Sequence, residues 1–160
     1  MSEQEIIFTG EYEYSLDSQR RVAIPKQWRV EGLKYYLLPG RGGVLQLIPD
    51  YTFKDFLTKV RKVSLTNAAV GRALAMLGSR AQECSCDRQG RISLSAKLKE
   101  YAKIDGDLVM LGAFTHAQIW TREAWSSQAD DTESVLDVID GLFADDGGDL
   151  VDLLKNLGGK

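Results

Sequence analysis

Two short stretches of the chain, 70 positions apart, follow the same pattern of residues. The stretch from position 17 reads DSQRRVAIP, and the stretch from position 87 reads DRQGRISLS. In both, Asp comes first, Gln follows two places later and Arg four places later. An internal repeat of this kind constrains the fold strongly, because both copies are expected to form the same local structure.

In total about 45 residues are repeated, once from about residue 8 and again from about residue 79. At the offset of 70, Glu13 matches Glu83, and Val22 and Ile24 match Ile92 and Leu94. Further along, YYLLPG (35–40) resembles VMLGAF (109–114), and LQLIP (45–49) matches AQIWT (117–121) at an offset of 72. The repeat therefore predicts two units, at residues 8–53 and 79–126.

Each unit has the same order of predicted elements. A strand with alternating residues (GEYEYSL or QECSC) is followed by a polar turn and a second strand (RVAIP or RISLS). A short helical piece comes next, for which Pro25 suits the first helical position and Ser95 suits the N-cap. Two more strands close the unit, joined by GRGG (40–43) or GAFTH (112–116). Such a unit has little interior of its own, so we expect an α+β fold in which two pseudo-symmetric β units share one core.

The remaining segments differ from the units in periodicity and charge. Residues 54–78 show helical spacing of apolar residues and predict a helical linker, whose second helix Thr66 or Asn67 can cap and Gly78 can end. Residues 127–160 hold nine acidic and two basic residues, a net charge of −7, which leaves +4 on the other 126 residues. This C-terminal tail is either helical or disordered. Its apolar residues allow one amphipathic helix around 135–143 and another around 150–157, separated by ADDGGD (144–149).

The sequence resembles a known family in GEYEYSLDSQRRVAIPKQWR and ECSCDRQGRISLSAKLKEYA, with a helical linker between them and IWTREAW after them. This is the MraZ family of bacterial transcription regulators, built from two tandem SpoVT/AbrB-like units. The resemblance covers roughly residues 8–126 and rests on the doubled Asp-x-x-x-Arg turn at the right separation. Two positions depart from the family pattern: Arg20 replaces the usual glycine, and Ser95 replaces a proline.

The resemblance implies a swapped-hairpin fold, self-association into a ring-like homo-oligomer of octamer size or larger, and binding to repeated double-stranded DNA sites. The implied role is repression of the protein's own division and cell-wall gene cluster, in the cytoplasm at the nucleoid. The same chain also allows an alternative, in which an AbrB-like oligomer serves as a protein-interaction module that does not bind DNA specifically.

The resemblance also implies that the Asp-x-x-x-Arg turns lie on the DNA-binding face, which makes Arg21 and Arg91 the leading candidates for DNA contact. The guanidinium of arginine is a permanently charged fork that pairs with phosphate or the edge of guanine. Asp17 and Asp87 cannot favour phosphate, and we expect them to brace the turns. Further basic residues near the turns extend the candidate interface: Arg20, Arg88, Lys26 and Arg29. The alternative is that the Asp–Arg pairs only lock the turns. If the first turn needs a positive φ, Arg20 is strained there by roughly 1 kcal/mol or more, and the turn differs in shape.

Other residues give no sign of catalysis or of a cofactor. His116 is the only histidine, and C-x-C at Cys84 and Cys86 with one distant histidine is a poor zinc pattern, so we expect no metal site, no small-molecule substrate and free thiols. We expect Trp28, Trp120 and Trp125 to pack rather than to stack on bases. No signal peptide and no apolar run long enough for a membrane span is apparent.

Overall fold

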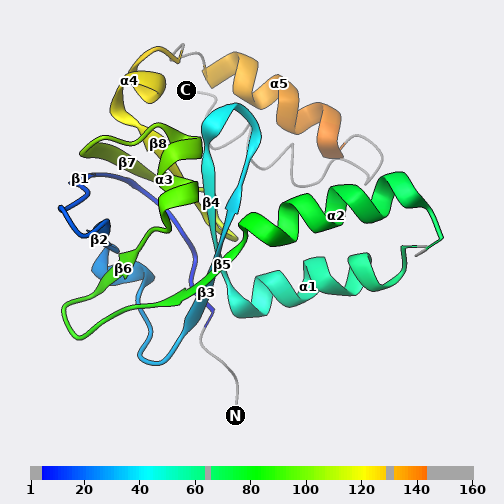
Figure 1. The fold of residues 1–160 in the computed structure, drawn as a ribbon. Coiled ribbons are helices and arrows are strands. Elements are labelled where there is room, and N and C mark those ends of the chain that lie inside the picture. The colour runs from blue at the N-terminus through cyan, green and yellow to red at the C-terminus, as the bar shows by residue number, and fades with distance from the viewer. Residues whose placement is uncertain (1–4, 64–65, 129–131, 144–160) are drawn as a thin grey trace. The chain divides into compact units, whose positions relative to one another are not determined.

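The computed structural model describes residues 5–63, 66–128 and 132–143. Its main sheet has six antiparallel strands in the order β1-β7-β8-β4-β3-β5, and β2 and β6 form a separate two-stranded sheet (Figure 1). The strands are β1 (Glu11–Ser15), β2 (Arg21–Ala23), β3 (Lys34–Pro39), β4 (Leu45–Pro49), β5 (Gln82–Ser85), β6 (Arg91–Ser93), β7 (Asp107–Gly112) and β8 (Ala117–Thr121). Eight strands in two antiparallel sheets, together with several helices, confirm the α+β class.

The two repeated units exchange strands. β1 of the first unit pairs with β7 of the second, and β5 of the second unit pairs with β3 of the first. In the β2–β6 pair, Val22 faces its own counterpart Ile92, and in the β4–β8 pair, Gln46 faces its counterpart Gln118. Equivalent residues that face each other lie on either side of a two-fold axis. The fold is therefore the pseudo-symmetric pair that the repeat predicts, with the exchange of strands that the family resemblance implies.

One part of the predicted alignment is wrong by a single residue. Glu13 pairs with Val109 and its counterpart Glu83 pairs with Tyr36, so Tyr36 corresponds to Val109 at an offset of 73. The sequence alignment of 35–40 with 109–114 uses an offset of 74.

Both units contribute to one core. Trp28 is fully buried, and its ring lies 5.3 Å from that of Phe8 and 5.2 Å from that of Tyr12, measured between centroids. The buried apolar residues of the second unit join the same cluster, among them Leu98, Leu108 and Ile119. Burial of each large apolar side chain stabilises the fold by about 1.5–3 kcal/mol. Because the side chains of each unit are buried against those of the other, neither unit keeps its core alone.

The short helical pieces differ in length between the units. The first is a 3₁₀ turn, η1 (Lys26–Trp28), and Pro25 precedes it instead of beginning it. The second is the longer α3 (Ala96–Ala102), which Ser95 caps as predicted, because its Oγ accepts a hydrogen bond from the Leu98 N–H at 3.2 Å. A further 3₁₀ turn, η2 (Arg41–Gly43), joins β3 to β4.

Helices α1 (Asp50–Arg61) and α2 (Ala68–Arg80) lie side by side and project from the sheet (Figure 1). Asn67 caps α2, since its side-chain oxygen accepts hydrogen bonds from Ala69 N at 3.0 Å and Val70 N at 3.2 Å. The prediction that Gly78 ends this helix is wrong, because α2 continues to Arg80. No residue of α1 or α2 is buried.

By its internal contacts the chain divides into Met1–Ser126 and Ser127–Lys160. The first part ends in α4 (Arg122–Ser126), and the second contains α5 (Thr132–Phe143), where the sequence allows an amphipathic helix. Val135 and Val138 on α5 are exposed. The acidic segment 144–149 and the possible helix at 150–157 lie outside the described residues. In the described part of the chain, no helix is long and apolar enough to span a membrane.

Candidate nucleic-acid interface

The first Asp–Arg turn is held by hydrogen bonds to one carboxylate. Asp17 Oδ1 accepts hydrogen bonds from Gln19 N at 2.9 Å and Arg21 N at 2.8 Å. Asp17 Oδ2 accepts one from Arg21 Nε at 2.9 Å. The aspartate thus fixes both the backbone of the turn and the direction of the arginine side chain, which is the bracing role predicted for it.

The second turn repeats this geometry. Asp87 Oδ1 accepts hydrogen bonds from Gln89 N and Arg91 N, each at 2.9 Å, and Oδ2 accepts one from Arg91 Nε at 2.9 Å. The pKa of both aspartates lies below the usual 3.8, mainly because the backbone N–H of Arg21 or Arg91 donates to the charged carboxylate. In each turn the aspartate holds the arginine through Nε.

The expectation that Arg20 changes the shape of the first turn is wrong. Arg20 has a φ of 58° and Gly90 a φ of 77°, so both occupy the left-handed region. The second unit stabilises Arg20 in this conformation. Its side-chain Nε donates to the Leu94 carbonyl at 3.0 Å, and its own carbonyl accepts a hydrogen bond from Leu94 N at 2.8 Å.

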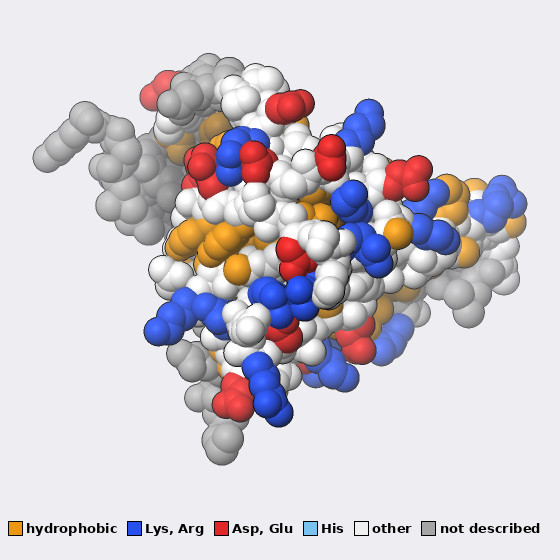
Figure 2. Space-filling view, turned by 60° about the vertical axis from the view of Figure 1, so that its left-hand side comes forward, with side chains coloured by type: hydrophobic (Ala, Val, Ile, Leu, Met, Phe, Trp, Pro, Cys, Tyr) orange, Lys and Arg blue, Asp and Glu red, His pale blue; other side chains and the backbone are white. Residues whose placement is uncertain are grey.

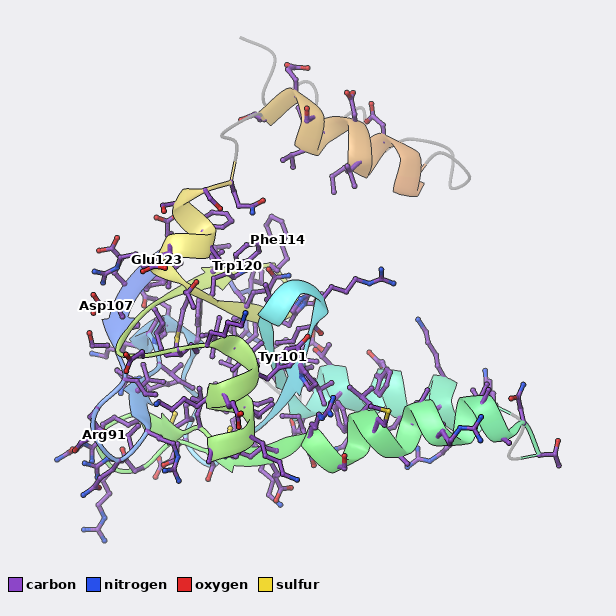
Figure 3. All side chains as sticks on the ribbon, turned by 45° about the horizontal axis from the view of Figure 1, so that its top comes forward. Arg91, Tyr101, Asp107, Phe114, Trp120 and Glu123 are labelled. Carbon is purple, nitrogen blue, oxygen red and sulfur yellow. The ribbon has the colours of Figure 1, made fainter. Side chains whose placement is uncertain are left out.

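Pairing between the units brings the two turns together. Strands β2 and β6 begin at Arg21 and Arg91, and they pair directly with each other. Leu94 N donates to the Arg20 carbonyl at 2.8 Å, and the symmetric bond from Ile24 N to the Gly90 carbonyl measures 2.9 Å. Arg91 Nη1 also lies 4.0 Å from Asp17 Oδ2 of the other turn. Figure 3 shows Arg91 on the side of the body away from the α1–α2 hairpin.

Arg29 of the first unit lies against the turn of the second. A Cβ added to Gly90 would come within 1.9 Å of Arg29 Nη1 and 2.6 Å of its Cζ. A side chain at this position would displace the guanidinium of Arg29, so Gly90 both supplies the positive φ and leaves room for Arg29 beside the turn. The surface at the second turn is therefore built from both units.

The remaining predicted basic residues are all exposed: Arg20 and Arg88 lie within the turns, and Lys26 lies in η1. Sequence reasoning missed Lys99, which lines a hollow of about 310 Å³ beside the first turn together with Asp17 and Arg20. The repeat could have indicated Lys99, because at the offset of 70 it is the counterpart of Arg29, which was predicted. Figure 2, which brings the β2–β6 side forward, shows Lys and Arg side chains across the middle and lower part of this face, with carboxylates between them.

The arrangement is suited to binding anions and not to nucleophilic chemistry. Burial raises the pKa of the Cys84 thiol to about 12 and raises that of Cys86 as well, so neither sulfur is a thiolate near neutral pH. Both cysteines are free, and burial lowers the pKa of His116, which lies between β7 and β8. Within residues 5–63, 66–128 and 132–143, no three His, Cys, Asp or Glu side chains group as metal ligands.

The three tryptophans pack against protein groups. Trp28 is in the core, and the rings of Trp120 and Trp125 meet edge to face with centroids 5.3 Å apart. The indole N–H of Trp125 donates to a carboxylate oxygen of Glu11 at 2.9 Å.

Comparison with known proteins gives a consistent family. The family model described as "MraZ protein, putative antitoxin-like" matches residues 7–75 and again residues 77–138. A protein of Moorella thermoacetica named transcriptional regulator MraZ is 34% identical over 127 residues, which cover 79% of this chain and 89% of the relative. Proteins of the same name from Syntrophomonas wolfei and Clostridium acetobutylicum are each 35% identical, over 80% and 74% of this chain and 90% and 84% of the relatives.

The two matches to the family model follow the two units that the strand pairing relates. Each match contains one Asp–Arg turn, and together they cover most of the chain. The chain belongs to the MraZ family.

Proposed function

We propose that this protein is a DNA-binding transcriptional regulator whose interface is formed by the two Asp–Arg turns. One observation carries the proposal: the pairing of β2 with β6 brings together two turns of the same geometry, one from each unit. The relatives named above are called transcriptional regulators, which supports this function.

The bonding within each turn suits an arginine that contacts DNA. An arginine side chain loses conformational freedom on binding, and the bond from Nε to aspartate removes part of that cost beforehand. The terminal guanidinium nitrogens can then donate to phosphate oxygens or to guanine O6 and N7. Five further basic residues extend the positive surface along which a phosphate backbone could lie: Arg20, Arg29, Arg88, Lys26 and Lys99.

Two turns provide few contacts, so affinity depends on several copies acting together. Linked sites raise avidity by roughly 10²–10⁴ when their geometry allows simultaneous contact. We therefore propose a ring-like homo-oligomer of octamer size or larger that binds repeated promoter sites. Its proposed role is repression of the protein's own division and cell-wall gene cluster, at the nucleoid, without enzymatic activity.

The test is fluorescence anisotropy with duplex DNA from immediately upstream of the protein's own gene, compared with scrambled DNA across a salt series. We expect Arg21→Ala/Arg91→Ala to lose the preference for the upstream DNA. The plot of log affinity against log salt should become shallower by about 0.9 for each phosphate that the variant no longer neutralises. The matched control is Arg72→Ala/Arg80→Ala, which removes the same charge from exposed positions of α2.

An unchanged preference in the Arg21→Ala/Arg91→Ala protein would place DNA binding on another surface. If the wild type shows no preference at all, the second candidate function becomes the better one. In that function the ring is a protein-interaction module that recruits a partner through its acidic tail. The tail's net charge of −7 and the exposed Val135 and Val138 of α5 favour this alternative.

A further inference from the structure

The two turns, DSQRR (17–21) and DRQGR (87–91), share three residues: the first aspartate, the last arginine and the glutamine between them. Gln19 and Gln89 stand midway between them, at equivalent positions. The residues on either side differ between the turns, with Ser18 and Arg20 in the first and Arg88 and Gly90 in the second. A neutral residue that recurs at the same place in both turns suits a task that both turns perform.

The backbone of each glutamine is fixed while its side chain is left available. Gln19 N donates to Asp17 Oδ1, and Gln89 N donates to Asp87 Oδ1, each at 2.9 Å. Both side chains are exposed, and within the described parts of the chain no hydrogen bond is found for either amide. By contrast, both aspartate oxygens and the Nε of Arg20, Arg21 and Arg91 are already engaged.

The chemistry of the amide suits a base edge better than a phosphate. Contacts to phosphate position a protein on DNA, whereas contacts to base edges select the sequence. A neutral amide gains little from the charge of a phosphate, but it offers one donor and one acceptor side by side. That pattern matches N7 and the N6 amino group of adenine in the major groove.

We infer that Gln19 and Gln89 contribute to sequence reading in the two turns, each contacting the major-groove edge of an adenine. The arginines beside them hold the turns against phosphates or neighbouring guanines. This inference rests on the proposed function, because it assigns a role within the same interface. It separates discrimination between bases from overall affinity, and the two can be measured independently.

The experiment is selection of bound duplexes from a pool with a randomised central region, using the full-length protein. Wild type is compared with Gln19→Met/Gln89→Met, which keeps the length of the side chains and removes their hydrogen-bonding groups. The backbone N–H groups that bind the aspartates remain, so we expect the turns to keep their shape, and the fold is checked by circular dichroism. Ser18→Ala is the matched control, since it removes an exposed polar side chain from the same turn.

We expect the double variant to lose a preference for adenine of roughly 5- to 150-fold at each contacted position. Its affinity for random-sequence DNA and its salt dependence should stay at the wild-type values, and Ser18→Ala should select the wild-type motif. The same motif selected by wild type and double variant would overturn the inference and leave the proposed function intact. Failure of the wild type to select any motif would overturn both. Equal loss of affinity for every sequence would also overturn the inference, because it would show that the glutamines contribute only to general binding.

Discussion

At the scale of single residues, two glycines with the same φ differ in what a side chain would meet. Gly90 and Gly32 both have a φ of 77°, but a Cβ would approach Arg29 only at Gly90, and it would meet nothing within 4 Å at Gly32. We expect Gly90→Ala and Gly32→Ala each to lower the free energy of unfolding by about 1–2 kcal/mol, since both force alanine into the left-handed region. Urea denaturation measures this loss.

Only Gly90→Ala should also weaken DNA binding, because it displaces the Arg29 guanidinium from the second turn. The effect should disappear when both proteins carry Arg29→Ala. DNA affinities reduced equally by Gly90→Ala and Gly32→Ala would contradict the role given to Arg29.

The two aspartates provide a second prediction at this scale, in the pH dependence of stability. Their pKa in the folded protein lies below the usual 3.8, so their contribution to stability is complete above that pH and is lost as the pH falls through the lower, folded value. Asp17→Asn/Asp87→Asn should therefore show a weaker fall in stability below about pH 4. Urea denaturation between pH 2.5 and 6 checks this, and identical slopes for both proteins would refute it.

The residues of the site were predictable to the extent that the repeat encodes them. The spacing of Asp and Arg predicts the braced turns, and the structure has them. The sequence raised the positive φ of Arg20 only as a condition, and the hydrogen bonds between Arg20 and Leu94 of the other unit could not be predicted from it. The proximity of Lys99 to the first turn was available from the offset of 70, but only after the units were known to exchange strands.

At the scale of elements, two capped helices differ in their connection to the core. Ser95 caps α3, which buries Leu98 and Ala102, whereas Asn67 caps α2, in which no residue is buried. We expect Ser95→Ala to lower the global free energy of unfolding by about 1 kcal/mol, in the range usual for a lost N-cap. Asn67→Ala should leave the global value nearly unchanged and speed hydrogen exchange of the α2 amides, because α2 can open without exposing core.

Urea denaturation and native-state hydrogen exchange together distinguish these two outcomes. An equal global loss in both variants would mean that α2 is packed as firmly as α3. Contact of the α1–α2 hairpin with another copy of the chain would produce that result.

The elements also show where sequence patterns stop being sufficient. Asn67 and Ser95 were predictable caps, because their side chains act on the adjoining backbone. Gly78 did not end α2, since a glycine inside a helix costs only about 1 kcal/mol, and Ala81 N still bonds to the Leu77 carbonyl. The sequence alignment of β3 with β7 was wrong by one residue because the helical pieces before these strands differ in length. α3 spans seven residues and η1 only three, so the offset between the repeats changes where no residue pattern marks it.

At the scale of the whole molecule, strand exchange explains why the sequence is doubled. β1 has its partner in β7 and β5 has its partner in β3, so each unit completes the sheet of the other. The same exchange places β2 beside β6 and thereby unites the two turns. A single unit would lack both a complete sheet and the second half of the candidate interface.

The distribution of charge over the molecule leads to the last prediction. Residues 127–160 carry −7 and the preceding 126 residues carry +4, so the tail and the body attract each other electrostatically. A tethered segment has an effective concentration in the millimolar range near its own body, and it can compete with DNA for the basic turns. Truncation after Gln128 should therefore tighten DNA binding at low salt.

The gain should shrink as salt rises, because the Debye length falls from about 30 Å at 0.01 M to about 8 Å at 0.15 M ionic strength. Anisotropy titrations of the full chain and the truncated chain across this range measure it. A full-length variant with the acidic residues of 127–160 changed to Asn or Gln is the control, and it should bind like the truncated chain if charge is the cause. Equal affinity of full-length and truncated protein at low salt would show that the tail does not compete with DNA, and its acidic residues would then be better explained by a separate protein partner.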